Sequence, residues 1–253
     1  MGAAEQKPAA LAPEQARRLV QFADGLDVLI RFHDREIEAE LLAQLLRHHI
    51  IDGLRELSTT DRSAAAISAL SKELDALGPS PDAQTLELLA AEYADIYLTH
   101  AYRASPSGSV WLTEDKLERQ LPMFEVRDWY EHYGISVPNW RVRSDDHVVH
   151  ELQFISHLCR LANPVAAQDV AGFMDLHVLP WVPAFFERAA QCSSQPLYGA
   201  VMELTDALLE DLRLLLEDIT GRERNVRDIS NLDTQRAPEP EAAPYIPGVA
   251  ESW

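Results

Sequence analysis

Hydrophobic residues recur every three or four positions through most of the chain, which is the spacing that places side chains on one face of an α-helix. Alternating patterns of useful length are absent, so no β-sheet is expected. The pattern predicts an all-α protein of about eight helices. The clearest rows are Leu19, Ala23, Leu26 and Ile30; Leu41, Leu45 and Leu46; Leu86, Leu89, Ala90, Tyr93 and Tyr97; Val148, Leu152, Ile155 and Cys159; and Leu197, Val201, Leu204, Leu208, Leu212, Leu215 and Ile219.

Proline and glycine residues mark where these helices should end. Gly78-Pro79 and Asn163-Pro164 each follow a row of apolar positions and stop the helical pattern. Pro180 and Pro183 lie inside an otherwise helical segment, residues 172–188. Because a proline ring clashes with the carbonyl group four residues earlier, this helix should kink or restart.

The apolar pattern and the composition divide the chain into five parts. Both ends are rich in Ala, Pro and polar residues without periodicity, which is typical of disorder. Residues around Pro138 also have no helical pattern, and we expect them to join two helical bundles. The predicted parts are a disordered start (1–13), an amino-terminal helical domain (14–134), a hinge (135–144), a smaller carboxy-terminal helical domain (145–221) and a disordered tail (222–253).

The charge balance excludes several classes of partner. The chain has 41 Asp and Glu against 22 Lys and Arg, a net charge of −19, so a role in tracking nucleic-acid phosphates is not expected. No apolar run approaches the roughly 20 residues of a membrane span. The first 13 residues have a single Lys and no apolar core, so no secretory signal is expected and the predicted location is the cytoplasm.

Spacing also argues against a metal site, a cofactor and catalysis. No His follows a Glu by three positions, as carboxylate di-iron bundles require, and Phe154 stands where a zincin helix beginning at His150 would need its second His. No Gly is followed by Lys, and neither G-x-G-x-x-G nor G-x-S-x-G occurs. Cys159 and Cys192 lie in apolar rows without a C-x-x-C pair. We therefore expect no catalytic residue, no metal and no cofactor.

Four segments resemble, in order and spacing, the TorD/DmsD family of cytoplasmic chaperones for molybdenum-cofactor oxidoreductases exported by the twin-arginine pathway. The resemblance covers about residues 85–220, and it implies the two-bundle helical fold of that family. The chain departs from the family pattern at Arg103-Ala104 and around Arg143. The segments are EYADIY at 92–97 with GSVW at 108–111; WYEHYG at 129–134; DHVVHELQFI at 146–155; and HVLPWVPAF at 177–185 with PLY at 196–198.

The resemblance implies a groove for an apolar peptide near the first segment. Ser109, Val110 and Trp111 form the end of a loop, where bulky apolar residues suit the rim of such a groove. A lid packed on the core is the alternative explanation. Tyr93 and Tyr97 lie one helical turn apart and are also candidate client-binding residues, although core packing is expected for at least one of them.

The resemblance also places Asp146 and His147 in the peptide-binding region. Asp146 follows Ser144 at an expected helix start, where a carboxylate stabilises the unpaired N–H groups of the first turn. A carboxylate also forms strong bidentate pairs with arginine, so we expect Asp146 to contact the client as well. Glu151, one turn later, should fix the helix in the bundle.

The resulting hypothesis is a non-catalytic chaperone that binds the signal peptide, the apoprotein or both, and delays export until the cofactor is inserted. One alternative is a nitrate-reductase-type assembly chaperone for a cytoplasmic molybdoenzyme subunit. Another is a helical hydrolase that uses Asp146, His147 and Glu151. Because a short hinge makes exchange of bundles between chains a low-cost route to dimers, we expect a monomer together with a domain-swapped dimer.

Overall fold

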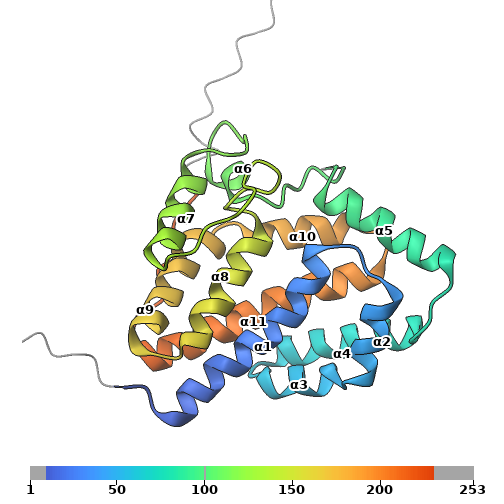
Figure 1. The fold of residues 1–253 in the computed structure, drawn as a ribbon, viewed down its shortest axis with the longest axis horizontal. Coiled ribbons are helices and arrows are strands. Elements are labelled where there is room, and N and C mark those ends of the chain that lie inside the picture. The colour runs from blue at the N-terminus through green and yellow to red at the C-terminus, as the bar shows by residue number, and fades with distance from the viewer. Residues whose placement is uncertain (1–9, 100, 231–253) are drawn as a thin grey trace, which may run out of the picture.

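The computed structural model describes residues 10–99 and 101–230, and within these residues it contains eleven α-helices, one π-helical turn and no β-strand (Figure 1). The all-α prediction is confirmed. The elements are α1 (Pro13–Asp34), α2 (Ala39–Arg47), α3 (Ile50–Leu57), α4 (Asp61–Leu77), α5 (Ala83–Tyr97), α6 (Gly108–Leu112), α7 (Leu121–His132), α8 (Val148–Leu161), α9 (Pro164–Phe173), the π-turn η1 (Met174–Val178), α10 (Val182–Cys192) and α11 (Pro196–Thr220). None of these helices is both long enough and apolar enough to cross a membrane.

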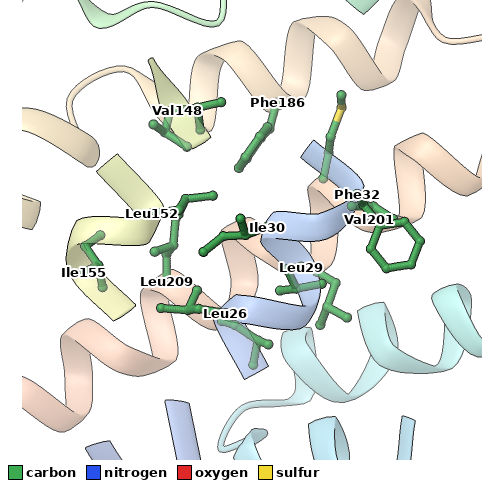
Figure 2. Packing of buried hydrophobic residues seen from close by; sticks show 14 of the residues in the cluster. Leu26, Leu29, Ile30, Phe32, Val148, Leu152, Ile155, Phe186, Val201 and Leu209 are labelled. Carbon is green, nitrogen blue, oxygen red and sulfur yellow. The ribbon is translucent and has the colours of Figure 1, made fainter. Parts of the chain in front are cut away.

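Helix α1 packs along α8 and also contacts α11, while α4 and α10 pack along α11. The apolar rows predicted from the sequence form the buried faces of these helices, and they meet in one hydrophobic cluster. The amino-terminal helices therefore share this cluster with helices that follow residues 135–144, and a division into two domains stays a prediction. Figure 2 shows Leu26, Leu29 and Ile30 of α1 beside Leu152 and Ile155 of α8, with Val201 and Leu209 of α11.

The structure has more helices than the eight expected, in part because two segments are interrupted. His49 adopts a left-handed conformation (φ 51°) that separates α2 from α3. Residues 172–188 are split by η1 and by a turn that includes Pro180. Pro183 lies in the first turn of α10, where its missing N–H costs no hydrogen bond. The predicted kink and restart are confirmed.

Buried polar side chains join helices that are far apart in sequence. The imidazole of His33 in α1 contacts the Tyr97 hydroxyl through Nδ1 (2.6 Å) and Thr205 Oγ1 in α11 through Nε2 (2.9 Å). The Glu92 carboxylate accepts hydrogen bonds from the Tyr102 hydroxyl (2.7 Å) and the Ser194 hydroxyl (2.6 Å). These bonds satisfy polar groups that would be costly to bury without partners. They join α5 to α1 and to the turn before α11.

The segment that follows α11, residues 222–230, lies against the bundle, and we call it the strap. Asp175 and Arg213 form an ion pair at 2.8 Å with both side chains about 1% exposed. Asp175 also accepts the Asn225 N–H at Oδ2 (3.0 Å) and the Arg227 N–H at its carbonyl oxygen (2.9 Å). The expectation of disorder from residue 222 is therefore wrong for the strap, because a buried carboxylate holds its main chain. Residues 1–9 and 231–253 lie outside the described residues.

Candidate functional site

Two segments that resemble the chaperone family lie side by side at the start of α6 and α8. The Gly108 N–H donates to the Asp146 carbonyl oxygen at 2.8 Å, and the Val148 N–H donates to the Pro106 carbonyl oxygen at 2.8 Å. These two bonds form an antiparallel contact between positions 38 and 42 residues apart in the sequence. The loop before α6 and the loop before α8 consequently form one unit.

The Asp146 carboxylate lies inside this unit and is fully buried. Its Oδ2 accepts hydrogen bonds from both the main-chain N–H (2.6 Å) and the hydroxyl (2.5 Å) of Ser109, in the first turn of α6. The start of α8 has a different cap, because His147 Nδ1 accepts the Val149 N–H at 3.2 Å. Asp146 thus supports the start of α6, whereas the sequence pattern predicted a cap on its own helix.

Glu151 is a second buried acid close to Asp146. Neither of its carboxylate oxygens has a hydrogen-bond partner among the described residues. Burial, together with the charge of Asp146, raises the pKa of Glu151 well above its usual value, which favours the protonated form of this carboxyl group. Gly108 lets the loop approach this region closely, since a Cβ atom there would lie 3.1 Å from Trp181 Nε1.

Val110 and Trp111 are the partly exposed apolar residues of the unit. The Trp111 indole N–H donates to the Ser105 carbonyl oxygen at 2.8 Å, which fixes the ring while part of it stays accessible. Ser109, two residues before Trp111, is fully buried. The predicted loop residues therefore have two roles: Ser109 anchors α6, and the two apolar side chains contribute to the surface.

Tyr93 and Tyr97 are largely core residues, 4% and 5% exposed, with ring centroids 4.9 Å apart. The Tyr93 hydroxyl donates to the Asp34 carbonyl oxygen at 2.7 Å. Tyr97 also lines a small cavity of about 210 Å³, and His147, which is distant from it in the sequence, lines the same cavity. The structure thus brings Tyr97 and His147 to one cavity and leaves Tyr93 in the core.

A larger cavity, which the sequence interpretation missed, lies between α7, η1 and the strap. Its volume is about 890 Å³, and we call it the α7 groove. A signal for it exists in the sequence, because acidic and aromatic residues recur at helical spacing along one face of α7. The residues that line the groove are Glu125, Asp128, Trp129, His132, Asp169, Leu176, His177, Asn225, Val226, Arg227 and Asp228.

No three His, Cys, Asp or Glu side chains of residues 10–99 and 101–230 gather as metal ligands would. The His33-Asp34 dipeptide, which resembles a metal phosphohydrolase motif, is part of the helix packing described above. Burial lowers the pKa of His33 to about 3, so its imidazole is neutral at physiological pH. His33 therefore serves as a hydrogen-bonding core residue.

Comparisons with known proteins identify the family and relatives of this chain. Residues 59–187 match the family model described as nitrate reductase delta subunit. The chaperone protein TorD of Vibrio cholerae serotype O1 is 28% identical over 200 residues, which cover 76% of this chain and 84% of that protein. The chaperone protein TorD of Aliivibrio fischeri is 26% identical over 195 residues (74% and 88%), and that of Photobacterium profundum is 25% identical over 198 residues (75% and 89%).

The relatives that cover most of this chain are named chaperones, and the helical fold is the one expected of them. The chain belongs to the nitrate reductase delta subunit family, which includes the TorD-like chaperones of molybdoenzyme maturation. The predicted family is confirmed. Because the family is non-catalytic, the alternative of a helical hydrolase that uses Asp146, His147 and Glu151 is not supported.

Proposed function

We propose that this protein binds the twin-arginine signal peptide of a molybdoenzyme precursor, together with its apoprotein, and delays export until the cofactor is inserted. One observation carries the proposal. Two of the segments that resemble the chaperone family, 108–111 and 146–155, are held together by the Ser109–Asp146 hydrogen bonds, and they leave Val110 and Trp111 partly exposed.

The chemistry of this surface suits the apolar part of a signal peptide. Trp111 offers a large apolar face whose indole N–H is already bonded, so covering the ring costs no unpaired donor. The cavity beside His147 is lined by Leu98 and Val142, which are 57% and 78% exposed. Covering these side chains removes apolar surface from water and favours binding.

Asp146 contributes in this proposal by holding Val110 and Trp111 in position. A direct ion pair between Asp146 and an arginine of the client is the alternative, and it requires the loop before α6 to open because the carboxylate is buried. The net charge of −19 favours encounter with a basic peptide in either case. Occupancy of the signal peptide is reversible, and it delays export by competing with the translocase.

We place this activity in the cytoplasm, and we propose that a domain-swapped dimer accompanies the monomer. A second candidate function follows from the family description, nitrate reductase delta subunit. In that case the client is the amino-terminal segment of a cytoplasmic molybdoenzyme subunit, which has no arginine pair followed by an apolar segment.

Titration calorimetry with matched peptides tests the proposal. The probe peptide has two adjacent arginines followed by an apolar segment, and two controls replace either the arginine pair by glutamine or the apolar segment by serine and glycine. We expect the probe to bind at least ten times more tightly than each control. Equal affinities for all three peptides would contradict signal-peptide recognition, and binding only to the amino-terminal segment of a cytoplasmic subunit would favour the second candidate.

A further inference from the structure

The α7 groove is separate from the residues that the proposed function uses, since none of Val110, Trp111 and His147 lines it. We infer that the α7 groove binds a peptide segment in which an arginine side chain lies next to apolar side chains. The inference rests on the proposed function, because it names a second contact region for the same client. Three observations on the groove support it.

The first observation is an apolar floor. The Trp129 ring packs against the edge of Phe173 with centroids 5.8 Å apart, so it is fixed in place while remaining partly exposed. Leu176 in η1 is 38% exposed and lines the same cavity. Val226 of the strap lines it too. Exposed apolar side chains in a concave site are typical of a binding groove.

The second observation is a surplus of acid at the groove. Four carboxylates line it, and Arg227 is its one guanidinium or ammonium group. Arg227 is paired with Glu125 at 2.8 Å, and Asp169 accepts a hydrogen bond from the Tyr133 hydroxyl at 2.5 Å. Asp128 is exposed and has no ion-pair partner among the described residues. The groove can therefore accept another guanidinium group.

The third observation is an unpartnered nitrogen on His177. This residue is 3% exposed, it lines the groove, and its Nδ1 has no hydrogen-bond partner among the described residues. Burial lowers the pKa of His177 to about 4, so the imidazole is neutral at physiological pH. A neutral imidazole accepts a hydrogen bond at one ring nitrogen, so a guanidinium N–H that reaches Nδ1 after the lining side chains move apart would satisfy the buried atom.

Charge decides between the client and the protein's own carboxy-terminal residues as the occupant. Residues 231–253 follow the strap directly, but they contain four acids, Asp233, Glu239, Glu241 and Glu251, and one base, Arg236. Like charges would repel at the acidic groove, whereas a basic client complements it. A second copy of this chain carries the same net charge of −19 and is disfavoured for the same reason.

Variants of the full-length protein test the inference with the arginine-pair probe peptide described above. Asp128→Asn removes an exposed charge at the groove, and Leu176→Gln removes part of its apolar floor. The matched controls are Asp75→Asn on α4, which also removes an exposed acid, and Leu88→Gln on α5, where the leucine is 50% exposed. We expect each groove variant to bind the probe about tenfold more weakly and each control to bind like the wild type, with unchanged melting temperatures.

The outcomes separate failure of the inference from failure of the proposed function. If the wild type and both groove variants bind the probe equally well, the inference that the α7 groove binds the client is wrong, while the proposed function stands. If the wild type does not bind the probe, both proposals fail. A synthetic peptide of residues 231–253 serves as a competitor: displacement of the probe would show that the groove accepts the chain's own carboxy-terminal residues and would overturn the choice of occupant.

Discussion

Ser109 and Asp146 are bonded twice through a single carboxylate oxygen, at 2.6 Å from the main-chain N–H and 2.5 Å from the hydroxyl. The other carboxylate oxygen, Oδ1, has no hydrogen-bond partner among the described residues. Both residues are fully buried. The pair therefore fixes the start of α6 from inside the protein, and its effect on a client can be separated from its effect on stability.

Ser109→Ala and Asp146→Asn distinguish anchoring from direct contact. If Asp146 acts by holding α6, both variants should lower the free energy of unfolding by about 1–3 kcal/mol and weaken probe binding by similar factors. If Asp146 pairs with a client arginine, Asp146→Asn should weaken binding much more than Ser109→Ala and should reduce the salt dependence of affinity. We expect the first result. Calorimetry at two salt concentrations and thermal denaturation give both quantities.

Glu151→Gln should increase stability, and the gain should grow with pH. In the unfolded chain Glu151 ionises near pH 4.5, whereas in the folded protein burial raises its pKa, so the folded protein releases the proton only at higher pH. Wild-type stability therefore falls as pH rises above 4.5, by up to about 1.4 kcal/mol per pH unit. Chemical denaturation from pH 5 to 8 should show the difference widening. The exposed Glu87→Gln is the control, and a constant difference for Glu151→Gln would contradict the prediction.

Truncation should distinguish the strap from the residues that follow it. A chain ending at Gly221 loses the strap contacts to Asp175 and Arg213 and uncovers apolar surface, so we expect destabilisation by at least about 2 kcal/mol, or about 4–8 °C in Tm. A chain ending at Ser230 keeps these contacts. Since residues 231–253 are rich in proline and polar residues, its Tm should stay within about 2 °C of the wild type. Equal losses in both chains would contradict the role of the strap.

His33 should make the protein sensitive to acid. Its folded pKa is lowered to about 3, so below pH 6.5 the unfolded chain binds a proton that the folded protein excludes. The contribution of His33 to the free energy of unfolding is fully present above pH 6.5. It decreases as pH falls toward 3, by up to about 1.4 kcal/mol per pH unit. His33→Gln should flatten this dependence, although its stability at pH 7 should be lower. The exposed His48→Gln should leave the slope unchanged, and denaturation curves from pH 4 to 8 measure it.

The helices were predictable because their buried faces repeat at a spacing that any single sequence displays. Their partners were not, since an apolar row on α1 shows which face is buried and not that α8 covers it. The strap was missed for a related reason. Its polar composition is typical of disorder, yet main-chain groups of Asn225 and Arg227 bond to Asp175, and main-chain contacts leave no trace in composition.

Prediction of the site was limited in the same way. The acid and the loop near Trp111 were both recognised, but the bond from Asp146 to Ser109 joins segments whose proximity depends on the tertiary fold. The local rule for helix starts identified Asp146 and assigned it to the wrong helix. The α7 groove was missed although its acidic and aromatic residues lie at helical spacing, because its second wall is the strap.

The packing of α1 along α8 has a consequence for biosynthesis. The apolar face of α1 leaves the ribosome first, and the helix that covers it begins only at Val148. At about 5–20 residues per second, that face waits on the order of 10 s for its partner. This member of a chaperone family therefore exposes an aggregation-prone surface of its own during synthesis, and its yield in cells should depend on translation speed and on general chaperones.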